Sequence, residues 1–255
     1  MKNFIKKIIK LFGYEIISNN EWLNKNENYI AEISRNESEM LNKIKNFTMT
    51  SIPSQWSLIQ SIKHIIRNNV EGSFVECGIF RGGNIILMSK LLEEYKVKKN
   101  IFAYDTFQGM PLPGKNDLDL RGNSSIDKFL NLKNSEDDGS QWCFCDIEDV
   151  KNNIKKFNIN YLKNINFVKG KVEETLLKIE NLPKKISLLR LDTDFYSSTK
   201  TELNILFPLL EKNGILIVDD YGHFMGAKKA VDEYFHENKV WFHRVDYSTR
   251  LLIKN

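Results

Sequence analysis

The sequence predicts an α/β fold in which a mostly parallel sheet is covered by helices. Short apolar runs that end in glycine or aspartate alternate with segments whose apolar residues recur at helical spacing. The runs at Ile186–Leu191 and 214–218 are almost continuously apolar, which is typical of parallel strands buried on both faces. With 255 residues and 42% hydrophobic content, the chain can bury one sizeable core, and no low-complexity linker or internal repeat divides it.

Residues 1–47 are expected to form an N-terminal amphipathic and helical cap segment, followed by the main domain at 48–255. In residues 1–17, apolar side chains alternate helically with lysines, which interrupt the apolar run too often for a signal peptide or a spanning helix. Such a stripe docks on the protein's own core or on a second subunit more often than on an anionic membrane. A homo-oligomer therefore stays open, and membrane contact through residues 1–17 is the less favoured alternative.

Charge and cysteine content narrow the class of protein. The 37 basic and 33 acidic residues are spread along the chain, and no Lys/Arg block interleaved with aromatic residues indicates nucleic acid as a partner. Cys77, Cys143 and Cys145 cannot form a closed set of disulfides, and their spacing matches no zinc site. Three unpaired cysteines fit a reduced, cytoplasmic setting.

Residues 74–83 predict a strand, a tight glycine turn and the start of a helix. Glu76 precedes Gly78, and Gly82 and Gly83 follow after three further residues. Glycine suits such a turn because a ligand can reach the main chain only where no side chain intervenes. The absence of Gly-x-Gly-x-x-Gly counts against NAD or FAD. An acid before Gly-x-x-x-Gly suits a ligand with a cationic amine, such as S-adenosylmethionine, and the alternative is an ordinary strand-to-helix turn.

The next strands extend this predicted cofactor site. Asp105 closes a second strand at 101–104, where a carboxylate can bind the two hydroxyls of a ribose, although it could also cap the following turn. The long polar stretch at about 109–146 is interpreted as a substrate-side lid. A capped helix from Asp146 and a third strand at 165–168 follow. The segment after that strand is placed beside the adenine ring and comprises Gly170, Lys171 and Val172.

The fourth and fifth predicted strands both end in acids. Asp192 and Asp194 follow the fourth strand, and Asp219 and Asp220 follow the fifth. Carboxyl ends of neighbouring parallel strands meet at one edge, so these carboxylates should converge and repel one another unless a cation lies among them. Oxygen ligands without Cys or His favour Mg²⁺, with Mn²⁺ or Ca²⁺ as alternatives. The competing interpretation is that each acid is a helix N-cap, which fits Asp194 better than the adjacent pair.

From about residue 48 to residue 235, the chain resembles the macrocin and mycinamicin type of O-methyltransferase. The resemblance is carried, in order, by residues 74–83, by YDTFQGMP at 104–111, by LRLDTDFYSST at 189–199, and by IVDDY at 217–221 with AVDEYF at 230–235. It implies a Rossmann-like class I S-adenosylmethionine-dependent fold with a seven-stranded, mostly parallel sheet. The last strand would be antiparallel, with residues 240–245 and 250–253 as the closing hairpin.

The resemblance also implies divalent-metal-dependent methylation of a sugar hydroxyl. The metal would lie on Asp192, Asp219 and Asp220. Thr193 stands where the family usually has glycine, and residues 113–141 match poorly, which leaves the acceptor open between a nucleotide-sugar, a glycan and a glycosylated metabolite. The residues expected to bind the cofactor are Glu76, Gly78, Arg81, Gly82, Gly83, Asp105, Thr106, Gly170, Lys171, Val172 and Asp192.

The implied reaction is an in-line displacement in which a metal-coordinated sugar hydroxyl attacks the sulfonium methyl group. Asp192 and His223 are the candidate bases, and His223 could equally be a solvated loop residue. Two other classes stay open: a catechol-type small-molecule O-methyltransferase, and a non-catalytic scaffold that binds the cofactor while its acids are structural.

Overall fold

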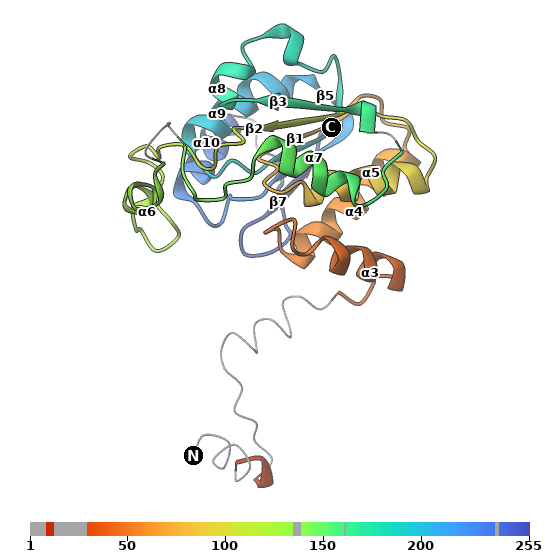
Figure 1. The fold of residues 1–255 in the computed structure, drawn as a ribbon, viewed down its shortest axis with the longest axis horizontal. Helices are drawn as coiled ribbons and strands as arrows, with labels where there is room; N and C mark the ends of the chain where they lie inside the picture. Colours follow the sequence, from red (N-terminus) through yellow and green to blue (C-terminus); the bar gives the residue numbers. More distant parts are fainter. Residues whose placement is uncertain (1–8, 13–29, 135–138, 161, 238–239) are drawn as a thin grey trace.

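The computed structural model describes residues 9–12, 30–134, 139–160, 162–237 and 240–255 (Figure 1). The predicted amphipathic stretch at 1–17 therefore lies outside the described residues except at 9–12. Its proposed contacts with a membrane or a second subunit stay predictions. None of the helices in the described ranges combines the length and the apolar character needed to cross a bilayer.

A seven-stranded sheet forms the centre of the fold, in the order β3-β2-β1-β4-β5-β7-β6. Strands β1 to β5 pair in parallel, and β7 pairs antiparallel with both β5 and β6. The predicted sheet with its antiparallel closing hairpin is thus confirmed, although β6 is shorter than expected. The bounds are β1 (Ser73–Cys77), β2 (Ile101–Asp105), β3 (Ile165–Lys169), β4 (Ile186–Leu191), β5 (Leu210–Val218), β6 (His243–Arg244) and β7 (Arg250–Ile253).

Helices cover both faces of the sheet (Figure 1). Alternate residues of β1 show why, because Phe74 packs with the helices of one face and Val75 with those of the other, and both are fully buried. Burial on both faces explains the continuous apolar runs of the parallel strands. The helices are α3 (Arg35–Ile44), α4 (Ile52–Arg67), α5 (Gly83–Glu94), α6 (Ser125–Leu132), α7 (Ile147–Lys155), α8 (Val172–Thr175), α9 (Tyr196–Leu206) and α10 (Met225–Tyr234).

Local sequence accounts for several helix starts. The Ser51 hydroxyl accepts a hydrogen bond from the backbone N–H of Ser54 at the start of α4, and Asp146 caps α7 in the predicted way. The N-cap interpretation of Asp194 is wrong, because the cap position of α9 is Phe195 and Asp194 has a left-handed backbone (φ +68°). An Asp tolerates this conformation better than most residues.

The polar segment at 109–146, interpreted from the sequence as a substrate-side lid, contains a helix as well as loops, because α6 forms behind its N-cap Ser124. The segment also packs firmly. The Asp117 carboxylate is 2% exposed and accepts hydrogen bonds from the backbone N–H groups of Tyr196 (2.7 Å) and Gly114 (2.7 Å). Asp117 thereby satisfies a free N–H at the start of α9 and fastens this segment to the body of the fold. A small apolar cluster completes the attachment and comprises Phe129, Trp142, Phe195, Phe224 and Ala227.

The order in which the chain adds strands to the sheet determines where the candidate site lies. From β1 the chain proceeds outward to β2 and β3, then returns to the other side of β1 to form β4 and β5. The loops after β1 and β4 therefore diverge at the carboxyl edge of the sheet, and ligands of open α/β sheets bind at such a reversal point.

Candidate active site

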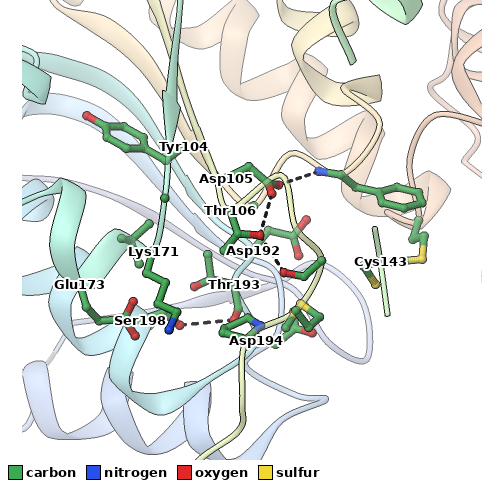
Figure 2. A pocket seen from close by; sticks show the side chains of 18 residues that line it. Tyr104, Asp105, Thr106, Cys143, Lys171, Glu173, Asp192, Thr193, Asp194 and Ser198 are labelled. Atoms are coloured by element: carbon green, nitrogen blue, oxygen red, sulfur yellow. Dashed lines mark hydrogen bonds between the residues drawn. The ribbon is translucent and has the colours of Figure 1, made fainter. Parts of the chain in front are cut away.

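Two cavities adjoin at this edge of the sheet. The first lies against the ends of β1, β2 and β3, and Figure 2 shows Tyr104, Asp105, Lys171 and Asp192 around it. The second is a hollow of about 680 Å³ between the start of α4, the 109–146 segment and the loop that joins β6 to β7. Ligands in the two cavities would lie next to each other, because both are lined by Met49, Gly78, Phe80, Cys143, Asp192 and Asp194.

The glycine turn is shaped first by close backbone approaches. A Cβ on Gly78, whose φ is +82°, would lie 1.9 Å from the carbonyl oxygen of Asp192. A Cβ on Gly83 would lie 2.8 Å from the carbonyl oxygen of Phe47, and Gly82 has a φ of +85° at the N-cap of α5. Of the predicted residues in this turn, Gly78 lines both cavities and Arg81 lines the second. Glycine is needed at these positions because a side chain would collide with the backbone that packs against the ends of β1 and α5. The same lack of a side chain leaves the main chain accessible to a ligand.

Asp105 and the segment after β3 lie together in the first cavity, as the sequence predicted. The Asp105 carboxylate accepts hydrogen bonds from the backbone N–H groups of Ile79 (2.8 Å), Phe80 (3.1 Å) and Phe107 (2.8 Å). Burial raises its pKa, while these hydrogen bonds act in the opposite direction. Asp105 therefore holds the glycine turn against β2, and ribose binding stays a prediction. The cavity is also lined by Thr106, Gly170, Lys171 and Val172.

A buried ion-pair network lies beneath the two cavities. Arg190 on β4 is 0% exposed, and its Nη1 donates to Glu76 Oε1 (2.7 Å) and Asp192 Oδ2 (2.6 Å). Its Nη2 contacts Asp219 Oδ1 (2.9 Å) and donates to the Thr50 hydroxyl (2.9 Å). One guanidinium thus joins carboxylates from the ends of β1, β4 and β5. This planar fork of donors suits several acceptors at once.

Glu76, predicted to face a cationic amine, is almost wholly buried in this network. Burial raises its pKa to about 7 even though Arg190 favours the charged form. Its Oε2 has no hydrogen-bond partner among the described residues, and its Oε1 also accepts from Asn84 Nδ2 (2.9 Å). Asn84 lines the second cavity and Glu76 lines neither, so Asn84 is the member of this pair nearer to a ligand.

An acidic cluster lies where the two cavities adjoin. Asp192, Asp194 and Asp220 each place one carboxylate oxygen within 4.8 Å of the others. Burial raises the pKa of Asp192 to about 6 and the pKa of Asp194 to about 7, and it raises the pKa of Asp220 well above its ordinary value. The neighbouring carboxylates raise all three pKa values further. Asp220 Oδ2 is buried and has no hydrogen-bond partner in the described part of the chain. An orphaned oxygen among repelling carboxylates fits a hard divalent cation.

The structure places Asp194, rather than the predicted Asp219, in the cluster with Asp192 and Asp220, and it gives Asp219 other partners. Asp219 Oδ1 accepts from the hydroxyls of Ser54 (3.0 Å) and Thr249 (3.0 Å) in addition to the Arg190 contact. Asp219 still lines the second cavity, so its role as a ligand stays a prediction.

His223 lies in the second cavity between two aromatic rings. Its ring centroid is 4.6 Å from that of Phe224, and its Nδ1 is 3.2 Å from the Tyr247 hydroxyl. Burial lowers its pKa, which favours the neutral imidazole that a general base requires. The predicted role as a base is compatible with this position and stays a prediction.

Sequence reasoning missed Arg190, Asn84 and Thr50, and it left Asp194 open between a converging carboxylate and a helix N-cap. A signal for Arg190 was present, because it is the one charged residue in the apolar run Ile186–Leu191 and a buried charge requires partners. Asn84 and Thr50 had no comparable signal, since a single polar residue beside a helix start is ordinary.

Comparison with known proteins gives consistent matches. A family model described as Macrocin-O-methyltransferase (TylF) matches residues 6–249. A demethyldecarbamoylnovobiocin O-methyltransferase from Streptomyces niveus is 33% identical over 191 residues, which cover 73% of this chain and 67% of that protein. A mycinamicin III 3''-O-methyltransferase from Micromonospora griseorubida is 24% identical over 192 residues, or 73% of this chain and 69% of that protein. The solved O-methyltransferase NovP superposes with a TM-score of 0.69 at 29% identity and covers 82% of both chains.

Proposed function

This chain belongs to the macrocin O-methyltransferase (TylF) family and is an O-methyltransferase, and we propose that it methylates a sugar hydroxyl with S-adenosylmethionine and a divalent cation. The observation that carries the proposal is the junction of the two cavities at Gly78, Asp192 and Asp194. One cavity lies where a class I fold binds its nucleoside, and the other is large and lined by acids. A donor and an acceptor would therefore meet beside the same carboxylates.

The names of relatives support a sugar acceptor. One relative from Streptomyces olivaceus, 27% identical over 189 residues, is named as a 4'-O-methyltransferase of a rhamnosyl tetracenomycin C. The second cavity of this chain suits a polar acceptor, since it is lined by carboxylates, hydroxyls and the Asn84 amide. These groups can accept or donate hydrogen bonds to a ring with several hydroxyls.

The cation would be held by Asp192 and Asp220, together with Asp194 or Asp219. When bound, a divalent cation supplies Lewis-acid assistance, because it lowers the pKa of a coordinated hydroxyl. The donor supplies an electrophilic methyl group. The residues of the protein would orient the reacting groups, accept the proton and exclude water.

The chain positions its acids and holds the proton acceptor. Arg190 fixes the orientation of Asp192 through a 2.6 Å hydrogen bond, so Asp192 is a weaker base than its burial alone would make it. Asp194 lines both cavities, so where Asp219 is the third ligand of the cation, the Asp194 carboxylate would be free to take the proton from the acceptor hydroxyl. His223 is the alternative base. Met49, Phe80 and Cys143 lie at the junction and would restrict water there.

The test combines binding and turnover. Asp220→Asn should abolish methyl transfer to a panel of sugar acceptors, while S-adenosylhomocysteine binding by calorimetry stays within about threefold of wild type. Chelation should remove wild-type activity, and Mg²⁺ or Mn²⁺ should restore it. Asp194→Asn and His223→Ala identify the base, whose loss should cost roughly 10²- to 10⁴-fold in kcat.

Three outcomes would contradict the proposal. Full activity after chelation would remove the cation, and methylation confined to catechols would favour the catechol-type alternative. Cofactor binding without transfer to any acceptor would favour the non-catalytic scaffold.

A further inference from the structure

A third hollow adjoins the second cavity on its outer side. It measures about 640 Å³ and lies between the start of α4 and the β6–β7 loop. The two hollows share Thr50, Ser51, Asp246 and Tyr247 in their walls. Together they offer more room than a single sugar ring requires, since one cavity of this size already suits a drug-sized ligand.

Two basic side chains line the outer hollow. Lys45 follows α3, Arg244 ends β6, and both side chains are exposed. Neither forms an ion pair with any carboxylate of the described residues, so both charges are available to a ligand in the hollow. The Nε of Arg244 donates to the Asp246 backbone carbonyl (2.9 Å), which fixes the guanidinium in the wall of the hollow.

The charges around Arg244 also favour an anion. Arg250 lies close enough that the charge of Arg244 lowers its pKa, after the larger effect of burial. Asp246 is the acid in this wall, and its carboxylate is already engaged by local donors. The Ser51 hydroxyl donates to one oxygen, and the backbone N–H groups of Ser248 (2.8 Å) and Thr249 (2.6 Å) donate to the other. The start of α4, whose partial charge is positive, faces the same hollow through Ile52 and Pro53.

We propose that the outer hollow binds a phosphate or diphosphate group of the acceptor, with Lys45 and Arg244 as its ligands. The acceptor would then be a sugar phosphate or nucleotide-sugar that extends from the acidic cluster into the outer hollow. This inference rests on the proposed function and selects one of the acceptor classes that the sequence left open.

Binding of UDP, dTDP and inorganic diphosphate tests the proposal on the full chain by calorimetry. Wild type should bind at least one of them, more weakly at high salt because exposed charges are screened. The double variant Lys45→Gln/Arg244→Gln should bind at least about tenfold more weakly, since one charged hydrogen bond is worth about 1.5 to 3 kcal/mol. Binding of diphosphate alone would indicate a sugar phosphate, and a requirement for the nucleoside would indicate a nucleotide-sugar.

A matched control removes the same two charges elsewhere. Arg67 and Lys98 are exposed and line none of the cavities described above, so Arg67→Gln/Lys98→Gln should leave diphosphate affinity unchanged. S-adenosylhomocysteine affinity should be equal in both double variants, because neither Lys45 nor Arg244 lines the first cavity.

The outcomes separate this inference from the proposed function. Phosphate affinity equal in wild type and in the Lys45/Arg244 variant, or absent in both, overturns the subsite. If the Lys45→Gln/Arg244→Gln variant methylates neutral glycosides as well as wild type does, the phosphate subsite is also overturned, while the proposed function stands. Phosphate binding that depends on Lys45 and Arg244, without methylation of any sugar, would instead retain the subsite and refute the proposed function.

Discussion

Replacing Arg190 by Met should destabilise the protein more than any exposed charge substitution. The variant keeps a side chain of similar length in a site that is 0% exposed, but it removes the only cation that contacts Glu76, Asp192 and Asp219 in the described structure. Removing one partner of a buried ion pair typically costs about 3 to 5 kcal/mol, because the remaining charge is left without compensation.

The magnitude follows from the size of the chain. One kcal/mol shifts the melting temperature of a domain of 150 to 250 residues by about 2 to 4 °C, so Arg190→Met should lower it by about 6 to 20 °C. Thermal and urea unfolding at pH 7.5, with chelator present, would measure this loss. Arg190→Lys should fall between wild type and Arg190→Met, because an ammonium keeps the charge but lacks the planar fork.

The control is Arg35→Met. Arg35 pairs with Glu39 at 2.9 Å, but their side chains are 91% and 53% exposed, so this substitution should change stability by less than about 1 kcal/mol. A melting temperature of Arg190→Met within 2 °C of the Arg35→Met value would refute the idea that Arg190 compensates buried carboxylates.

Three further predictions concern other parts of the protein. Glu202 on α9 is 0% exposed, and its Oε1 accepts a hydrogen bond from the Thr193 hydroxyl (2.9 Å). Burial raises its pKa from the ordinary value of 4.5 to about 8, so this group should lower the stability of wild type as pH rises between those values. The melting temperature of Glu202→Gln should therefore rise relative to wild type over that pH range and level off above it, and a pH-independent difference would contradict this. Gly78→Ala should abolish S-adenosylhomocysteine binding or folding, whereas Gly122→Ala, with a similar φ of +81° but no atom within 4 Å of the added Cβ, should cost only about 1 to 2 kcal/mol. Asp117→Ala should cost about 0.5 to 2 kcal/mol as a lost helix cap and should speed proteolysis within residues 109–134, and an unchanged cleavage rate would show that this attachment is unimportant.

Much of the fold was predictable from local patterns. Continuous apolar runs located the five parallel strands, since strands buried on both faces carry few polar residues. The predicted strand boundaries were less accurate. Strand β5 begins at Leu210, four residues before the predicted start, and the difference arises because residues 211–213 are polar and the pairing with β4 shifts register there. Helix α6 was missed although Ile126, Phe129 and Leu130 recur at helical spacing, because its eight residues lie within a long polar segment rich in turn-forming residues.

Local sequence patterns were enough to show that acids follow β4 and β5 and that a glycine turn follows β1. Parallel strands in one sheet bring such ends to a common edge, so Asp192, Asp220 and Gly78 could be placed together without coordinates. The choice among the four acids required the three-dimensional contacts, which place Asp194 in the cluster while Asp219 contacts Arg190, Ser54 and Thr249. Partner choice among buried charges depends on segments that are distant along the chain and near in space, and no local pattern records that proximity.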